Sequence, residues 1–188
     1  MERMFNLDLE NNIPTWFSSL LWAIAALLSY TSFESAFEQK EKRAWGFLSL
    51  TFLFLSCDEV ASLHENLGLM ASKYLFASKW VDALGMRLWP IALGPIVIFG
   101  LFWFTVWFKC CFRNSPHGGR QVALGTILFL AGAVGLETGM NFLMFHGFLK
   151  PFWKVEAIFE EALEMVGAIL IVSGLLSHLQ NKRELCQV

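Results

Sequence analysis

Apolar residues dominate five long segments of this chain, and short stretches rich in polar residues, glycine or proline separate them. The segments cover residues 13–33, 44–67, 88–112, 120–147 and 153–180. About 20 apolar residues in a helix are enough to cross the ~30 Å hydrocarbon core of a membrane. A transmembrane β-barrel would instead show alternating segments of roughly ten residues. The pattern therefore predicts an all-α integral membrane protein, a bundle of five transmembrane helices that forms a single domain over residues 1–188.

The longest connection, residues 66–87, mixes apolar residues with Lys73, Lys79 and Asp82. Such a mixture is typical of an amphipathic helix that lies in the membrane interface. We therefore predict a short interfacial helix between the second and third spans. An ordinary connecting helix that covers the end of the bundle fits the same residues.

The composition agrees with this class of protein. Hydrophobic residues make up 56% of the chain and charged residues 16%, whereas soluble domains carry roughly 25% charged residues. The net charge of -2, without a basic patch interleaved with aromatic residues, argues against a nucleic-acid partner. The four cysteines lack the spacing of a CxxC motif or a zinc ribbon, so we expect free thiols.

Basic residues are shared unequally between two sets of connections. One set holds eight of them, Lys40, Lys42, Arg43, Lys109, Arg113, Arg120, Lys182 and Arg183. The other holds six, Arg3, Lys73, Lys79, Arg87, Lys150 and Lys154. Short cytoplasmic loops of membrane proteins collect the larger share of lysine and arginine. We therefore predict that the N-terminus faces outside and that the C-terminus lies in the cytoplasm.

Acidic and histidine side chains interrupt three of the five apolar segments. The second segment carries Asp58, Glu59, His64 and Glu65, the fourth carries Glu137, Asn141 and His146, and the fifth carries Glu156, Glu160, Glu161 and Glu164. No lysine or arginine accompanies them in the interior of these segments. A charged carboxylate at the centre of a membrane costs at least ~2.5 kcal/mol. The carboxyls must therefore be protonated, face water or bind cations.

The spacing of these acids predicts that they meet. Asp58, Glu137 and Glu164 lie 9, 10 and 11 residues from the same end of their predicted spans, a depth of ~14 to 16 Å at 1.5 Å per residue. Asp58 and Glu65 are seven residues apart, so a continuous helix would place them on one face. We therefore expect the second, fourth and fifth spans to share an acidic pocket that opens at one side.

Small residues in the fourth span would allow such helices to approach closely. Gly125, Gly132 and Gly139 recur every seven residues, and small residues are enriched where transmembrane helices pack together. The first and third spans carry no charge in their interior. We therefore expect them to be lipid-facing supports of the other three.

The candidate chemistry follows from these residue types. Facing carboxylates and histidines inside a helix bundle hold metal ions in di-iron and di-manganese proteins, although the Glu-x-x-His spacing of those proteins is missing here. Many acids with few histidines suit Fe, Mn or Zn. The leading hypothesis is a membrane-embedded metal-carboxylate enzyme, an oxidoreductase or a hydrolase, that acts on a lipid or another hydrophobic substrate. The expected catalytic residues are Asp58, Glu65, Glu137 and Glu164. The expected metal ligands are Asp58, Glu59, His64, Glu65, Glu137, His146, Glu160, Glu161 and Glu164.

Three other interpretations remain open. The same carboxylates would suit a proton or metal-cation transporter or channel, although the apolar remainder of the three spans favours a one-sided cavity. The chain would also suit a small subunit of a larger membrane complex, buried against a partner protein or a second copy of itself. Finally, the acids would form a purely structural network if they only fixed the register of the helices.

Overall fold

The structure, a computed structural model, describes residues 12–75, 89–145 and 153–185. These residues are helical almost throughout and include no strand. In chain order the helices are α1 (Ile13–Glu34), α2 (Gln39–Ala61), α3 (Leu63–Leu75), α5 (Trp89–Cys111), α6 (Pro116–Leu130), the π-helix η3 (Ala131–Leu136), α7 (Glu137–Phe145) and α8 (Trp153–Leu185). Five stretches are long and apolar enough to cross a membrane: Ile13–Glu34, Gln39–Ala61, Leu93–Cys111, Pro116–Met140 and Ala157–Glu184. The predicted all-helical architecture with five apolar spans is therefore confirmed for the described residues.

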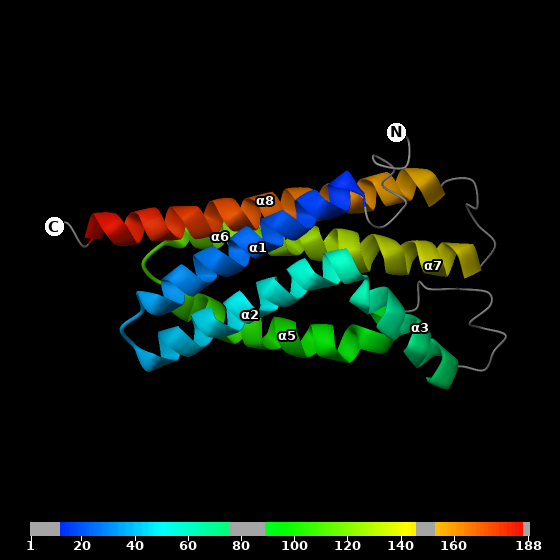
Figure 1. Cartoon of the computed structure of the whole chain (residues 1–188), viewed down its shortest axis with the longest axis horizontal. Coiled ribbons are helices and arrows are strands. Elements are labelled where there is room, and N and C mark those ends of the chain that lie inside the picture. The colour runs from blue at the N-terminus through cyan, green and yellow to red at the C-terminus, as the bar shows by residue number, and fades with distance from the viewer. Residues whose placement is uncertain (1–11, 76–88, 146–152, 186–188) are drawn as a thin grey trace.

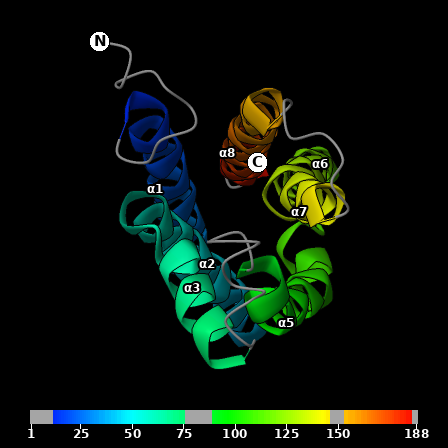
Figure 2. The same ribbon diagram turned by 90° about the vertical axis from the view of Figure 1, so that its right-hand side faces the viewer.

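The helices run roughly along one long axis (Figure 1). α1 and α2 form one antiparallel pair, and α6 with η3 pairs with α8. Contacts between α1 and α8 join the two pairs, while α5 packs against α2 and α3 (Figure 2). α1 begins at the end of the bundle where α3 and α7 lie, and α8 finishes at the opposite end (Figure 1).

The connections with many basic residues meet at that opposite end. The Lys182 ammonium donates a hydrogen bond to the Ser35 carbonyl at 2.7 Å, and Lys182 and Arg113 lie 4.0 and 3.8 Å from Glu41 and Glu38. The ends of α1, α5 and α8 and the start of α2 are thereby drawn together. Which side of a membrane this end would face stays a prediction.

The first span is more than the peripheral support that we expected. α1 buries Trp22, Ala25 and Ser29 between its neighbours, and the Trp22 ring stacks on Phe52 of α2. α1 also exposes large apolar side chains such as Ile24 and Leu27, as a lipid-facing helix would. The prediction was incomplete because it considered charge alone, whereas serine and alanine also let helices pack closely. α5 fits the prediction better, since the most apolar stretch of Leu93–Cys111 buries none of its residues.

Glycines form the contact between α6 and α8. At three positions a Cβ atom on α6 or η3 would lie within 2.8 Å of an α8 carbonyl oxygen: Gly118 at Gly174 (2.6 Å), Gly125 at Gly167 (2.6 Å) and Gly132 at Glu160 (2.8 Å). The seven-residue spacing on both helices is that of an antiparallel helix pair with a regular seam. The predicted repeat stops before Gly139, which has no described atom within 4 Å of its Cβ position. The π-helix η3, which contains Gly132 and ends before Gly139, changes the register between these two glycines.

The second span ends earlier than predicted. Ser62 adopts a left-handed conformation with φ 47° and ψ 44°, which ends α2 at Ala61, and the chain restarts as the separate helix α3. α3 confirms a short helix between the second and third spans, although it begins before residue 66, and residues 76–88 lie outside the described chain. Leu67, Met70 and Tyr74 form an exposed stripe along it, as an amphipathic helix requires.

Candidate functional site

The break between α2 and α3 brings Asp58 and His64 together. One carboxylate oxygen of Asp58 accepts a hydrogen bond from the His64 backbone N–H at 2.8 Å. The other lies 2.8 Å from the His64 ring atom Nδ1. Asp58 therefore caps the first turn of α3 and orients the imidazole. The expectation that Asp58 and Glu65 share one face of a continuous helix is wrong, because the helix breaks between them.

The pair changes the protonation of His64. Burial alone lowers the pKa of the imidazole, but the hydrogen bond to Asp58 and the charges of Asp58, Glu65 and Glu137 outweigh burial, and the pKa rises above its ordinary value of 6.5. The His64 side chain is 30% exposed and that of Asp58 13% exposed. His64 is therefore a half-buried histidine that keeps its proton to higher pH than usual.

Trp89, the first residue of α5, connects this pair to the fourth span. Its indole N–H donates a hydrogen bond to the Glu137 carboxylate, and its ring meets the His64 ring edge-on with the centroids 4.8 Å apart. Gly68 makes room for it, since a Cβ atom there would lie 2.5 Å from the Trp89 Cβ. From the sequence alone, Trp89 is simply a tryptophan of the membrane interface. Gly68, four residues after His64, is the sequence feature that could have indicated a bulky side chain packed against α3.

Replacing Trp89 by phenylalanine is expected to lower the stability of the protein by about 1.5–3 kcal/mol, because it removes a hydrogen bond to a buried carboxylate. Glu137 is only 8% exposed, so water cannot readily replace the lost donor. Thermal unfolding in detergent measures the effect. Trp16→Phe is the matched control, because Trp16 is 61% exposed, and an equal loss in both variants would contradict the role of this hydrogen bond.

Four other carboxyls act electrostatically on Glu164 of α8. Glu164 interacts electrostatically with Glu161, Glu59, Glu160 and Glu137, which come from α2, α7 and α8. The carboxyl of α2 in this group is therefore Glu59, whereas Asp58 is engaged by His64. The difference arises because adjacent helix residues point about 100° apart.

Glu59 has its own indole donor. The Trp22 N–H of α1 donates a hydrogen bond to a Glu59 oxygen at 3.3 Å. Two tryptophans from the spans that we expected to be mere supports, Trp22 and Trp89, thus hold two carboxylates of this end of the bundle. A search for charged residues could not reveal Trp22 and Trp89, because an indole N–H donates a hydrogen bond without carrying a charge.

The metal ligand set is not assembled in the described part of the chain. No three histidine, cysteine, aspartate or glutamate side chains there are arranged to hold a metal ion. Of the predicted ligands, Asp58, Glu59, His64, Glu65, Glu137, Glu160, Glu161 and Glu164 are described, whereas His146 lies outside the described residues. The side chains of Asn141 and Glu156 also lie outside the description.

His178 lies at the far end of the bundle and takes no part in the acidic group. It is 5% exposed, and its ring sits 4.8 Å from the Trp45 ring and 5.5 Å from the Phe112 ring, centroid to centroid. Neither ring nitrogen has a hydrogen-bond partner among the described residues.

These features define an all-helical protein that has five helices apolar enough to cross a membrane and an acidic end with an aspartate–histidine pair. The chain belongs to the family described as "Domain of unknown function (DUF8692)", which matches residues 1–179. Neither a curated protein nor a solved structure gave a significant match.

Proposed function

We propose that the protein is an integral multipass membrane enzyme in which His64, oriented by Asp58, transfers protons to or from a hydrophobic substrate. The observation that carries this proposal is the contact of 2.8 Å between the Asp58 carboxylate and His64 Nδ1. A histidine whose Nδ1 is held by a carboxylate presents its other nitrogen, Nε2, to a reacting group. Proton transfer by a positioned histidine is a common form of catalysis.

The surrounding charges suit a proton donor. Because the pKa of His64 is raised, the imidazolium form persists toward neutral pH, where it can give a proton to a substrate oxygen or nitrogen. Asp58 stabilises the imidazolium directly, and Glu137, fixed by Trp89, contributes a negative charge behind it. The carboxyls around Glu164 extend this acidic region toward α8.

The helices around the pair support a hydrophobic substrate. α3, which carries His64, exposes an apolar stripe of Leu67, Met70 and Tyr74. An exposed apolar face beside five apolar spans fits burial in the acyl chains or the interface of a membrane. A lipid or another membrane-dissolved molecule would then approach His64 without crossing water.

A metal-dependent form of the same enzyme is the second candidate. Histidines that bind metals commonly donate the other ring N–H to a carboxylate, as the Asp58–His64 contact allows. His64 Nε2 together with Glu137 and further carboxylates of the acidic end would offer nitrogen and oxygen ligands suited to Fe, Mn or Zn. Binding would require His64 to lose its proton and the carboxylate side chains to close around the ion.

One experiment tests the proposal and separates its two forms. Purified protein in nanodiscs is incubated with a membrane lipid extract, and products are sought by mass spectrometry. We expect His64→Gln to lower the rate of product formation by about 10² to 10⁴-fold. His117→Gln is the matched control, because His117 is exposed at the opposite end of the bundle.

Full activity of His64→Gln would refute both forms of the proposal. Elemental analysis of the same preparations then decides between them. Stoichiometric metal in the wild type that is lost in Glu137→Gln plus Glu164→Gln would establish the metal-dependent form. Metal-free wild-type protein with full activity would establish the form that uses proton transfer alone.

A further inference from the structure

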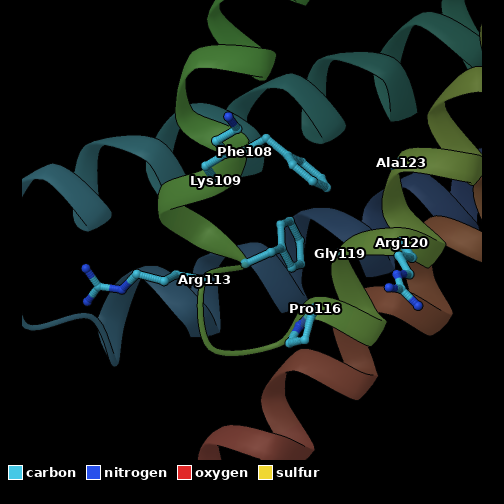
Figure 3. Close-up of a pocket in the computed structure, with 8 residues that line it drawn as sticks. Phe108, Lys109, Arg113, Pro116, Gly119, Arg120 and Ala123 are labelled. Carbon is cyan, nitrogen blue, oxygen red and sulfur yellow. The ribbon is translucent and has the colours of Figure 1, made fainter.

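A groove of about 440 Å³ lies where α5 turns into α6, at the end of the bundle opposite to Asp58, His64 and Glu164 (Figure 3). Its lining consists of Phe108, Lys109, Phe112, Arg113, Pro116, Gly119, Arg120 and Ala123. Three of these eight residues are basic and none is acidic, and the other five are apolar or glycine. The groove thus combines an apolar floor with a positive rim.

The fold creates the groove by separating two consecutive helices. α5 packs against α2 and α3, whereas α6 packs against α8, so the two helices part as they leave their turn (Figure 1). At the turn they are close, because a Cβ on Gly119 would lie 2.9 Å from the Phe112 Cβ. Beyond it, Phe108 of α5 and Ala123 of α6 form opposite walls.

The basic residues border the groove from both helices. Lys109 and Arg113 come from the α5 side and Arg120 from the α6 side (Figure 3). Arg113 lies 3.8 Å from Glu38, and Lys109 and Arg120 are exposed. α6 also begins here, so the positive end of its helix dipole adds to the same potential.

We propose that this groove binds an anionic phospholipid, with one acyl chain against Phe108, Phe112 and Ala123 and the phosphate at Lys109 and Arg120. A free phosphate would leave the apolar floor uncovered, and a neutral lipid would leave the basic rim without a counter-charge. Basic pockets between transmembrane helices bind anionic lipid head groups in this way. The inference rests on the proposed membrane insertion and is independent of the chemistry at His64.

The test measures lipid binding to purified full-length protein by native mass spectrometry. The probes are phosphatidylglycerol, phosphatidylcholine with the same acyl chains, and soluble glycerol phosphate. We expect phosphatidylglycerol to bind more tightly than phosphatidylcholine, and Lys109→Gln plus Arg120→Gln to weaken its binding about 30-fold, since each basic residue near a membrane surface contributes about fivefold. Ala123→Phe, which fills the apolar wall without changing charge, should also weaken it.

Matched controls keep the outcomes clear. Lys40→Gln plus Arg183→Gln removes the same charge from the same end, and Leu124→Phe adds bulk at an exposed neighbour of Ala123; both should bind phosphatidylglycerol like the wild type. His64→Gln should also bind it unchanged. The proposal is overturned if the two lipids bind equally, if the control pair loses as much binding as the groove pair, if Ala123→Phe has no effect, or if glycerol phosphate competes as well as the lipid.

Discussion

Gly125→Ala is expected to destabilise the helix bundle by about 1–3 kcal/mol, the usual cost of adding bulk to a close-packed contact. The new Cβ would lie 2.6 Å from the Gly167 carbonyl oxygen and 2.9 Å from an Ile171 side-chain carbon. The first neighbour is backbone, so it cannot rotate away. α6 and α8 would have to move apart along their whole seam, and thermal unfolding in detergent or an SDS titration would measure the lost stability.

Gly100→Ala is the matched control for this variant. Gly100 lies in the middle of α5, and no described atom comes within 4 Å of its Cβ position. Because alanine favours a helix over glycine by roughly 0.5–1 kcal/mol, this change should leave the stability unchanged or slightly raise it. Equal destabilisation by both substitutions would contradict the glycine seam and indicate a general intolerance of α5 and α6 to alanine.

The seam was the part of the packing that the sequence could predict. A seven-residue glycine repeat keeps one face of a helix small over several turns, and this is visible without a structure. The five spans were predictable for the same reason, since each depends on a local property, the length of an apolar segment. Both predictions needed no information about which helices become neighbours.

The break at Ser62 could not be predicted in this way. Glycine and proline are the residues that usually end a helix. Residues 57–67, on both sides of Ser62, contain neither of them. Serine carries a steric cost in the left-handed region, and the Asp58 hydrogen bonds to His64 help to offset it. The hydrogen bonds between Asp58 and His64 form only when the helix ends at Ala61 and restarts at Leu63. No local sequence pattern therefore reveals where the helix ends.

The partners of the carboxyls were hidden for a related reason. The acids themselves stand out against apolar surroundings, and their convergence from three spans was expected from their depth. The choice of Glu59 over Asp58 as the neighbour of Glu164, and the indole donors of Trp22 and Trp89, depend on how the helices are rotated about their axes. The π-helix η3 adds to this, because it ends directly before Glu137 and changes the register of the residues that follow it. π-helical segments of this kind often occur beside functional residues.

Asp58→Asn is expected to lower the pKa of His64, because the hydrogen bond and the charge that raise it are both weakened while burial, which lowers it, remains. Asparagine can still accept the backbone N–H of His64 and cap α3, so the fold should persist. Titration of ¹⁵N-labelled histidine by NMR measures the change, and His64→Gln identifies the signal. Glu65→Gln is the matched control, since its charge acts in the same direction with a smaller effect.

The same variant makes the protonation of His64 visible in stability and activity. A raised pKa in the folded protein means that the Asp58–His64 pair stabilises the fold fully below pH 6.5, the ordinary pKa of histidine, and loses this contribution as the pH rises through the raised value. In Asp58→Asn this loss should move to lower pH or disappear.

If His64 acts as a proton donor, the alkaline limb of the activity profile should move to lower pH in the same variant. If a metal instead occupies Nε2, His64 should not titrate in the loaded protein, and its titration should appear only after chelation. An unchanged His64 pKa in Asp58→Asn would exclude Asp58 as the group that sets the protonation of this histidine.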